Sequence, residues 1–161
     1  MTLHILYVSE TNGSHDKRFR AFIEARDGVQ VTCVVAPPLS PRWAVPNVRA
    51  ANKSDHLLIE ASAPTDVISA LAHVIDFVRA GVVHAGPVPT IGYYAAKADA
   101  PRLVVMSWGR DLLWDIHQSD ELRAQAAHAL HASRAFVADC ETVRATGISL
   151  GADPSRTVVF P

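Results

Sequence analysis

Two short apolar runs in the middle of the sequence end abruptly in residues that suit a ligand better than a hydrophobic core. Residues 82–85 are followed by Gly86, and residues 103–107 are followed by the polar run 108–111. We predict that both runs are strands and that residues 90–98 between them form a short helix. A strand, a helix and a strand in this order require parallel strands joined by a right-handed crossover. Because ligands bind outside the carboxyl ends of such strands, the two loops are predicted to share one ligand site.

A third polar loop follows the apolar run at residues 3–9 and contains Asn12, Gly13, Ser14 and His15. Gly13 permits a tight turn or a close backbone approach, and the helix expected after the loop can favour an anionic or hydroxyl-rich ligand at its N-terminus. The dinucleotide fingerprint G-x-G-x-x-G and the P-loop pattern are both absent here. An ordinary loop and a ligand-binding loop are therefore both open interpretations.

The polar side chains of these loops are the candidate functional residues. Asp111 is the predicted catalytic residue, and the alternative is that it only caps the helix or turn that follows it. His128 and His131 are neighbours on a helix face, but no Glu or Cys accompanies them, so we predict no metal site. The predicted substrate-binding residues are Asn12, Gly13, Ser14, His15, His84, Gly86, Trp108, Gly109, Arg110 and Glu141.

The wider pattern alternates apolar runs with amphipathic segments, which is typical of an α/β fold. Strands are expected at residues 3–9, 29–36, 56–61, 82–85, 103–107, 135–139 and 157–160. Helices are expected at residues 17–26, 64–80 (with Gly81 as the C-terminal cap), 90–98, 119–133 and from 141 onward, and the proline-rich stretch 37–55 is expected to be a surface loop carrying Trp43. The predicted fold class is a three-layer Rossmann-like domain with a mainly parallel sheet of about seven strands.

Length and composition favour one domain with a substantial core. The chain has 161 residues, of which 49% are hydrophobic and 19% charged, and its formal net charge is −1. This balance argues against a nucleic-acid-binding protein, which normally has a concentrated basic surface. Cys33 and Cys140 are expected to be buried thiols, since their spacing fits neither a disulfide nor a metal site. No secretion signal or membrane span is recognisable, so a cytoplasmic location is expected.

The order of the motifs resembles the N-terminal half of a GT-B glycosyltransferase of family 4, the retaining group related to glycogen and mannosyl transferases. The resemblance rests on LHILYVSETNG, VVHAG, PRLVVMSWGRDLL, AFVADCETVRATG and the final TVVFP. It extends over essentially the whole chain. In that family the last motif continues into Pro-Asn-Gly and a second Rossmann-like domain, so a C-terminal domain is expected to be missing here.

This resemblance implies that the chain is the acceptor-binding half of an enzyme that transfers a sugar from a nucleotide-sugar donor to an acceptor hydroxyl. The expected partners are a sugar or lipid-linked acceptor and the missing C-terminal domain, which would bind the donor; no cofactor is implied. Family members place the loop that corresponds to Asn12, Gly13, Ser14 and His15 beneath the donor phosphates. They commonly have His-Gly where this chain has Trp108 and Gly109, so the role of that histidine does not transfer. The paired-glutamate signature of the donor half is also absent, and the chain is expected to be inactive alone.

The residues are compatible with such a transfer. The reaction develops positive charge at the anomeric carbon and negative charge on the leaving phosphate, which requires preorganised polar groups. Trp108 offers a flat apolar face to a sugar ring, Gly109 allows close approach, Asp111 can bind hydroxyls and Arg110 suits an anionic acceptor. Trp108 can equally be a core residue.

Two further interpretations stay open at this point. The chain can be a free-standing, non-catalytic Rossmann-like module that binds a small molecule or a protein. The basic helix at residues 17–26 can touch anionic lipid at the inner face of a membrane, although we expect a solvated helix face there.

Overall fold

The computed structural model describes residues 2–36, 47–50, 56–61 and 63–160 and shows one eight-stranded sheet with the order β3-β4-β2-β1-β5-β6-β7-β8. β3 runs antiparallel to β4, and the other neighbouring strands pair in parallel. The strands are β1 (Leu3–Ser9), β2 (Val29–Val35), β3 (Asn47–Ala50), β4 (Leu57–Glu60), β5 (Val82–Ala85), β6 (Val104–Met106), β7 (Ala135–Ala138) and β8 (Thr157–Val159).

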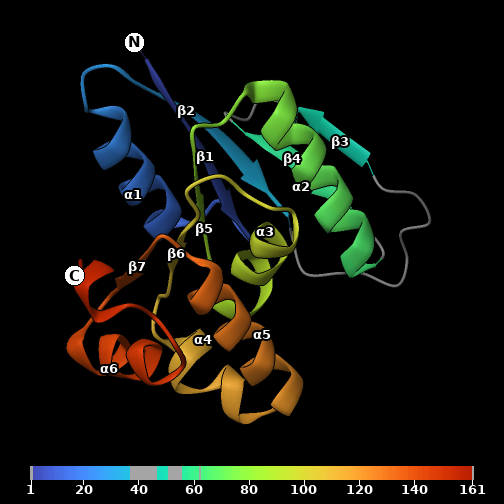
Figure 1. Cartoon of the computed structure of the whole chain (residues 1–161). Helices are drawn as coiled ribbons and strands as arrows, with labels where there is room; N and C mark the ends of the chain where they lie inside the picture. The colour runs from blue at the N-terminus through green and yellow to red at the C-terminus, as the bar shows by residue number, and fades with distance from the viewer. Residues whose placement is uncertain (1, 37–46, 51–55, 62, 161) are drawn as a thin grey trace.

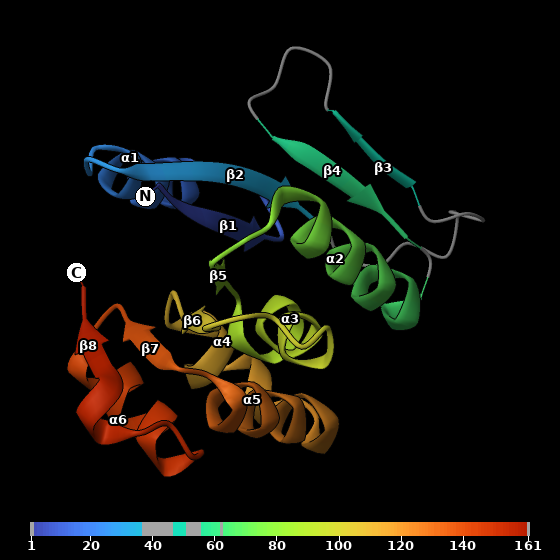
Figure 2. The ribbon, with the colours of Figure 1, turned by 45° about the horizontal axis from the view of Figure 1, so that its top comes forward.

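Helices connect these strands and cover the two faces of the sheet unequally (Figure 1). The α-helices are α1 (Ser14–Glu24), α2 (Pro64–Val78), α3 (Tyr93–Lys97), α4 (Arg110–Leu113), α5 (Asp120–Ala132) and α6 (Glu141–Ser149), and shorter helical turns are η1 (Val88–Gly92), η2 (Asp115–His117) and η3 (Pro154–Arg156). Helices α2, α3 and α5 lie side by side on one face, and α1 covers the other face at β1 and β2 (Figure 2).

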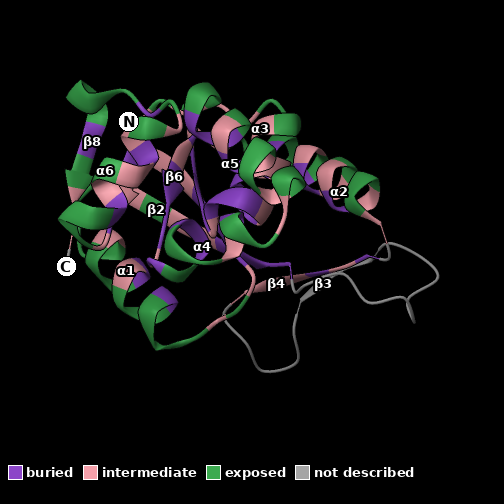
Figure 3. Ribbon diagram, turned by 90° about the horizontal axis from the view of Figure 1, so that it is seen from below, coloured by how far each residue is buried: buried purple, intermediate pink, exposed green. Residues whose placement is uncertain are grey.

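The alternation of side chains along each strand divides the core into two parts. In β1, Leu6 and Val8 contribute to the large apolar cluster under α2, α3 and α5, whereas Tyr7 between them points to the opposite face. Tyr7 packs there with Cys33 and Met106 in a smaller cluster beneath α1. Buried residues follow the central strands throughout this arrangement (Figure 3).

The fold class and the seven strands expected from the sequence are confirmed. The main correction concerns the stretch 37–55, which was expected to be a loop but contains the edge strand β3 at Asn47–Ala50. That strand runs antiparallel to β4, so it needs no crossover helix, and the helix-based pattern could not reveal it. Trp43 lies outside the described residues.

Smaller corrections concern helix ends and a thiol. α1 begins at Ser14 rather than residue 17, because the Asp16 carboxylate accepts the Gly13 backbone N–H at 2.9 Å and holds the first turn. Arg79, not Gly81, takes the left-handed conformation at the end of α2, with φ 52°. Cys33 is buried as expected, but Cys140 is exposed, since it lies at the N-cap of α6 on the sheet edge.

An apolar groove of about 250 Å³ lies beside α1 on the face of the sheet that α1 covers. Its walls include Phe19 and Phe22 of α1, and its floor includes His84, Val104 and Val137 of the central strands. Within the described part of the chain, none of the helices is both long and apolar enough to cross a membrane.

Candidate functional site

The loops that follow β1, β5, β6 and β7 meet at the carboxyl edge of the sheet, as expected for parallel strands. Two backbone hydrogen bonds hold neighbouring strand ends in register: Gly86 N–H donates to the Val8 carbonyl at 3.1 Å, and Ser107 N–H donates to the Val137 carbonyl at 3.0 Å. The loop after β5 therefore lies between the loops after β1 and β6, and the loop after β6 lies beside the end of β7, where α6 begins.

Asp111 joins two of these loops from a buried position. Its side chain is only 4% exposed, and Oδ1 accepts the Ser107 hydroxyl at 2.5 Å while Oδ2 accepts the Val88 N–H at 2.9 Å. Ser107 Oγ in turn accepts the Gly109 N–H at 3.0 Å. Burial raises the pKa of the Asp111 carboxyl, and these hydrogen bonds act in the opposite direction. Both carboxylate oxygens have protein partners, so Asp111 is placed to hold the loops; its catalytic role stays a prediction.

Asp16 has the same function in the loop after β1, which is the first loop of the chain. It is 2% exposed and accepts hydrogen bonds from Tyr7 Oη at 3.1 Å, Thr11 Oγ1 at 2.9 Å and Gly13 N–H at 2.9 Å. The loop is thereby fixed against β1. Gly13 has a φ of −76°, and a Cβ added there would meet its nearest atoms at 3.5 and 3.6 Å, so this turn does not itself require glycine.

In the loops after β5 and β6, close packing requires glycine at Gly86 and Gly109. A Cβ on Gly86 would lie 2.5 Å from the Met106 carbonyl oxygen and 3.4 Å from the Trp108 ring. Gly109 has a φ of 93°, and a Cβ there would lie 2.8 Å from Asp139 Oδ2. Gly86 leaves room for the Met106 carbonyl, and Gly109 allows the Asp139 carboxylate to approach the backbone closely.

A cavity of about 100 Å³ opens at this edge between α1 and the loops after β6 and β7. Trp108 and Asp139 both line it, and each has a buried polar atom, Trp108 Nε1 and Asp139 Oδ1, with no hydrogen-bond partner among the described residues. The complete lining is His15, Arg18, Phe19, Trp108, Asp139 and Phe160.

Sequence reasoning predicted two of these lining residues, His15 and Trp108, and missed the others. Asp139 had a usable signal, because it directly follows the apolar run of β7 at the carboxyl edge. Arg18 and Phe19 gave no such signal, since their positions depend on how α1 crosses the sheet.

Other predicted site residues lie outside this cavity. His84 is on β5 beneath α1, 8% exposed, with its ring edge against Tyr7 and Phe19 at centroid distances of 5.4 and 6.3 Å. Burial lowers the pKa of His84 to about 4, so the imidazole is neutral at pH 7. Arg110 is exposed and pairs with Asp115 at 3.3 Å.

The remaining predicted residues are at the rim of the edge. Asn12 Nδ2 lies 3.1 Å from His56 Nδ1, which links the first loop to the start of β4. Ser14 is exposed on the first turn of α1, and Glu141 is exposed on α6, 3.5 Å from Arg144. The structure therefore brings His15, Trp108 and Gly109 together with Asp139, and leaves Arg110 and Glu141 facing solvent.

Glu10 is a polar residue of this edge that the sequence analysis did not single out. Its Oε1 accepts the Thr90 hydroxyl at 2.6 Å, which connects the loop after β1 to η1. Burial raises the pKa of the Glu10 carboxyl, and the Thr90 hydrogen bond partly opposes this shift.

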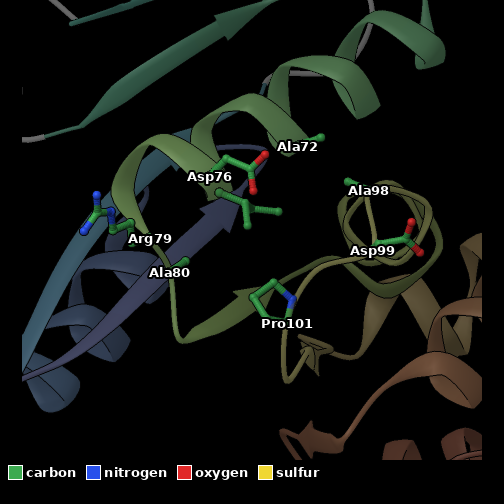
Figure 4. A pocket seen from close by; sticks show the side chains of 8 residues that line it. Ala72, Asp76, Arg79, Ala80, Ala98, Asp99 and Pro101 are labelled. Atoms are coloured by element: carbon green, nitrogen blue, oxygen red, sulfur yellow. The ribbon is translucent and has the colours of Figure 1, made fainter.

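A larger hollow of about 490 Å³ lies at the amino end of the sheet, between α2 and the end of α3 (Figure 4). Its charged residues Asp76, Arg79 and Asp99 are solvent-accessible, and none of the residues that line it has a buried polar atom without a partner. Across the described ranges, no group of three His, Cys, Asp or Glu side chains could hold a metal ion.

Comparison with solved structures shows which proteins have a similar fold. A protein of Listeria monocytogenes assigned to the UDP-N-acetylglucosamine 2-epimerases superposes with a TM-score of 0.72 at 12% identity, covering 99% of this chain and 44% of that chain. The chain shares its fold with UDP-N-acetylglucosamine 2-epimerases. The epimerase of Neisseria meningitidis bound to UDP-GlcNAc gives 0.65 at 10% identity over 99% of this chain and 45% of that chain. These neighbours have the GT-B Rossmann-like fold.

A third neighbour, MnaA of S. aureus in complex with UDP, gives a TM-score of 0.65 at 15% identity over 98% of this chain and 43% of that chain. This chain therefore spans less than half the length of the structures it resembles. The sequence matches no protein-family model and no curated protein.

Proposed function

We propose that the chain is the acceptor-binding half of an enzyme that transfers a sugar from a nucleotide-sugar donor to an acceptor hydroxyl. The observation that carries the proposal is the cavity at the carboxyl edge, where side chains of the loops after β6 and β7 meet residues of α1. Ligands of open α/β sheets bind at this edge. The shared fold supports a nucleotide-sugar enzyme, because two of the solved neighbours contain UDP or UDP-GlcNAc.

In this proposal the rest of the enzyme binds the donor, as in a family 4 glycosyltransferase. The first loop, fixed by Asp16, faces the donor phosphates, and Trp108 presents its ring beside the acceptor. The acceptor is a free or lipid-linked sugar. Residues 17–26 provide a basic surface for a membrane-borne acceptor, and no cofactor is required.

The solved neighbours favour a second candidate, epimerisation of a nucleotide sugar at C2. The two reactions differ in the bonds that break. Transfer cleaves the bond between the anomeric carbon and the phosphate and requires an acceptor, whereas epimerisation must break and remake the C2–H bond. Solvent deuterium therefore enters C2 only in the second case.

The test compares this chain with the product of the complete open reading frame that encodes it, each incubated with isotope-labelled nucleotide sugars. Labelled sugar on an acceptor, formed only by the longer product, is the expected result. Incorporation of deuterium from D₂O at C2 without an acceptor would establish the epimerase instead. If neither product binds or converts a nucleotide sugar, a non-catalytic binding module replaces both.

A further inference from the structure

The chain leaves β1 and β5 toward opposite faces of the sheet, which creates a topological switch point between these two strands. β1 and β5 pair with each other in the middle of the sheet. The loop after β1 leads to α1 on one face, and the loop after β5 leads to η1 and α3 on the other (Figure 2). Ligands of open α/β sheets bind in the crevice between two such loops. A side chain that joins the two loops is therefore placed to meet a ligand.

Glu10 joins the two loops across this switch point. It directly follows β1, and its Oε1 accepts the hydroxyl of Thr90 in η1 at 2.6 Å. The other carboxylate oxygen, Oε2, accepts no hydrogen bond from the described part of the chain and is still accessible to solvent. Thr90 therefore fixes the carboxylate and leaves one of its oxygens open to a ligand.

Two other carboxylates of this edge are already occupied by the protein. Both oxygens of Asp111 accept hydrogen bonds, from Ser107 and from the Val88 N–H. Asp16 accepts three hydrogen bonds and holds the loop after β1. Glu10 differs from both in having one fixed and one open oxygen, so it is better placed to act on a substrate.

The charges that act on Glu10 are negative. Burial raises the pKa of the Glu10 carboxyl, and the hydrogen bond from Thr90 partly opposes this shift. The charges of Asp111 and Asp115 raise the pKa further. Burial and then the charge of Glu10 raise the pKa of Tyr94 on α3, so this hydroxyl stays neutral. A carboxylate with a raised pKa is a stronger base, and this environment therefore suits proton transfer.

We propose that Glu10 is the general base of the reaction and takes the proton of the acceptor hydroxyl on Oε2. In this step the acceptor oxygen forms a bond to the anomeric carbon, while the bond from that carbon to the donor phosphate breaks. The nucleotide leaves with the electron pair of the broken bond, and the acceptor proton moves to Glu10 and then to solvent. Thr90 is a positioning residue, because it acts only through Glu10. The inference rests on the proposed function and names a catalytic residue within it.

The first measurement is a pH titration of the chain labelled with ¹³C at the glutamate side-chain carboxyls, followed by NMR. The resonance absent in Glu10→Gln identifies Glu10, and we expect its pKa to lie above the ordinary value of 4.5. Thr90→Val removes the hydroxyl at nearly constant volume and should raise this pKa further, whereas Thr90→Ser should restore it. A Glu10 pKa at or below 4.5 would overturn the proposal.

The second measurement is the pH dependence of kcat/KM for sugar transfer by the product of the complete open reading frame. The rate should rise with pH through the pKa of Glu10, because only the ionised carboxylate accepts a proton. Glu10→Gln should lower kcat about 100- to 10,000-fold and remove this limb of the profile. Glu121→Gln, the same change at an exposed position of α5, is the matched control and should alter neither quantity. Should Glu10→Gln not fold, a shift of the limb to higher pH in Thr90→Val, and its return in Thr90→Ser, decide the question.

Failure of the base and failure of the proposed function give different results. If the wild-type enzyme transfers sugar and Glu10→Gln keeps its rate and its pH profile, the base is wrong and the transferase stands. If the wild-type enzyme glycosylates no acceptor, the transferase is wrong and the acceptor base falls with it, even where the Glu10 carboxyl titrates above 4.5.

Discussion

Asp111 accepts the backbone N–H of Val88 at 2.9 Å, across the boundary between two strand-end loops. Asp111, the catalytic residue predicted from the sequence, thus holds the loop after β5 against the loop after β6. Because Ser107 donates to its other oxygen, both carboxylate oxygens have a structural partner.

Replacing Asp111 by alanine should therefore destabilise the fold. The change leaves the Val88 N–H and the Ser107 hydroxyl buried without acceptors, and we expect the free energy of unfolding to fall by about 2–4 kcal/mol. Urea denaturation measures this. Asp115→Ala, which removes only an ion pair with exposed Arg110, should cost less than about 1 kcal/mol. An unchanged stability in Asp111→Ala would show that the carboxylate is not structural.

His84 should make the protein less stable in acid. Its folded-state pKa is about 4, below the ordinary value of 6.5, so the unfolded chain binds more protons between these values. Stability contributed by the neutral imidazole is full above pH 6.5 and is lost as the pH falls toward 4, by about 3 kcal/mol. Glu10 and Asp111, with raised pKa values, act in the opposite direction, so the difference between wild type and His84→Leu isolates the imidazole.

Denaturation curves of wild type and His84→Leu at several pH values between 4 and 7 measure that difference. The wild type should lose more stability than the variant as the pH falls. His73→Leu is the matched control, because His73 is exposed on α2, and it should follow the wild-type pH dependence. Parallel curves for wild type and His84→Leu would contradict the assignment.

Gly109 and Gly13 should respond differently to an added side chain. Gly109→Ala places a Cβ at a φ of 93° and 2.8 Å from the Asp139 carboxylate, so we expect a loss of about 2–3 kcal/mol. Gly13→Ser keeps a φ of −76° at a helix N-cap, where serine is favourable, and should stay within about 1 kcal/mol of wild type. Thermal and urea unfolding of both variants measure the two losses of stability. Equal losses in Gly109→Ala and Gly13→Ser would contradict the prediction.

Asp16 should be the main anchor of the first loop. Asp16→Ala leaves the hydroxyls of Tyr7 and Thr11 and the Gly13 N–H without their acceptor, and we expect a loss of about 2–4 kcal/mol together with faster amide exchange in residues 10–14. Hydrogen exchange followed by NMR measures the local effect. Lys17→Ala, at an exposed position of the same helix, should change neither quantity by a comparable amount.

The sequence alone was sufficient for the fold class and the seven parallel-sheet strands, because apolar runs and helical periodicity are local signals. It also located the edge of the sheet that carries the polar loops, since that edge follows from parallel pairing. It failed for β3, because an antiparallel edge strand in a proline-rich stretch has no comparable signature.

Tertiary structure decided which of the polar side chains meet. Asp111 and Asp139 both follow apolar strands in the sequence, yet Asp111 accepts hydrogen bonds from Ser107 and Val88, whereas Asp139 lies against Gly109 and lines the cavity. The direction of a side chain beyond a strand end depends on backbone angles such as the φ of Gly109 and on contacts with elements distant in sequence. That Trp108 and Asp139 line one cavity therefore became visible only when α1, β6 and β7 were brought together.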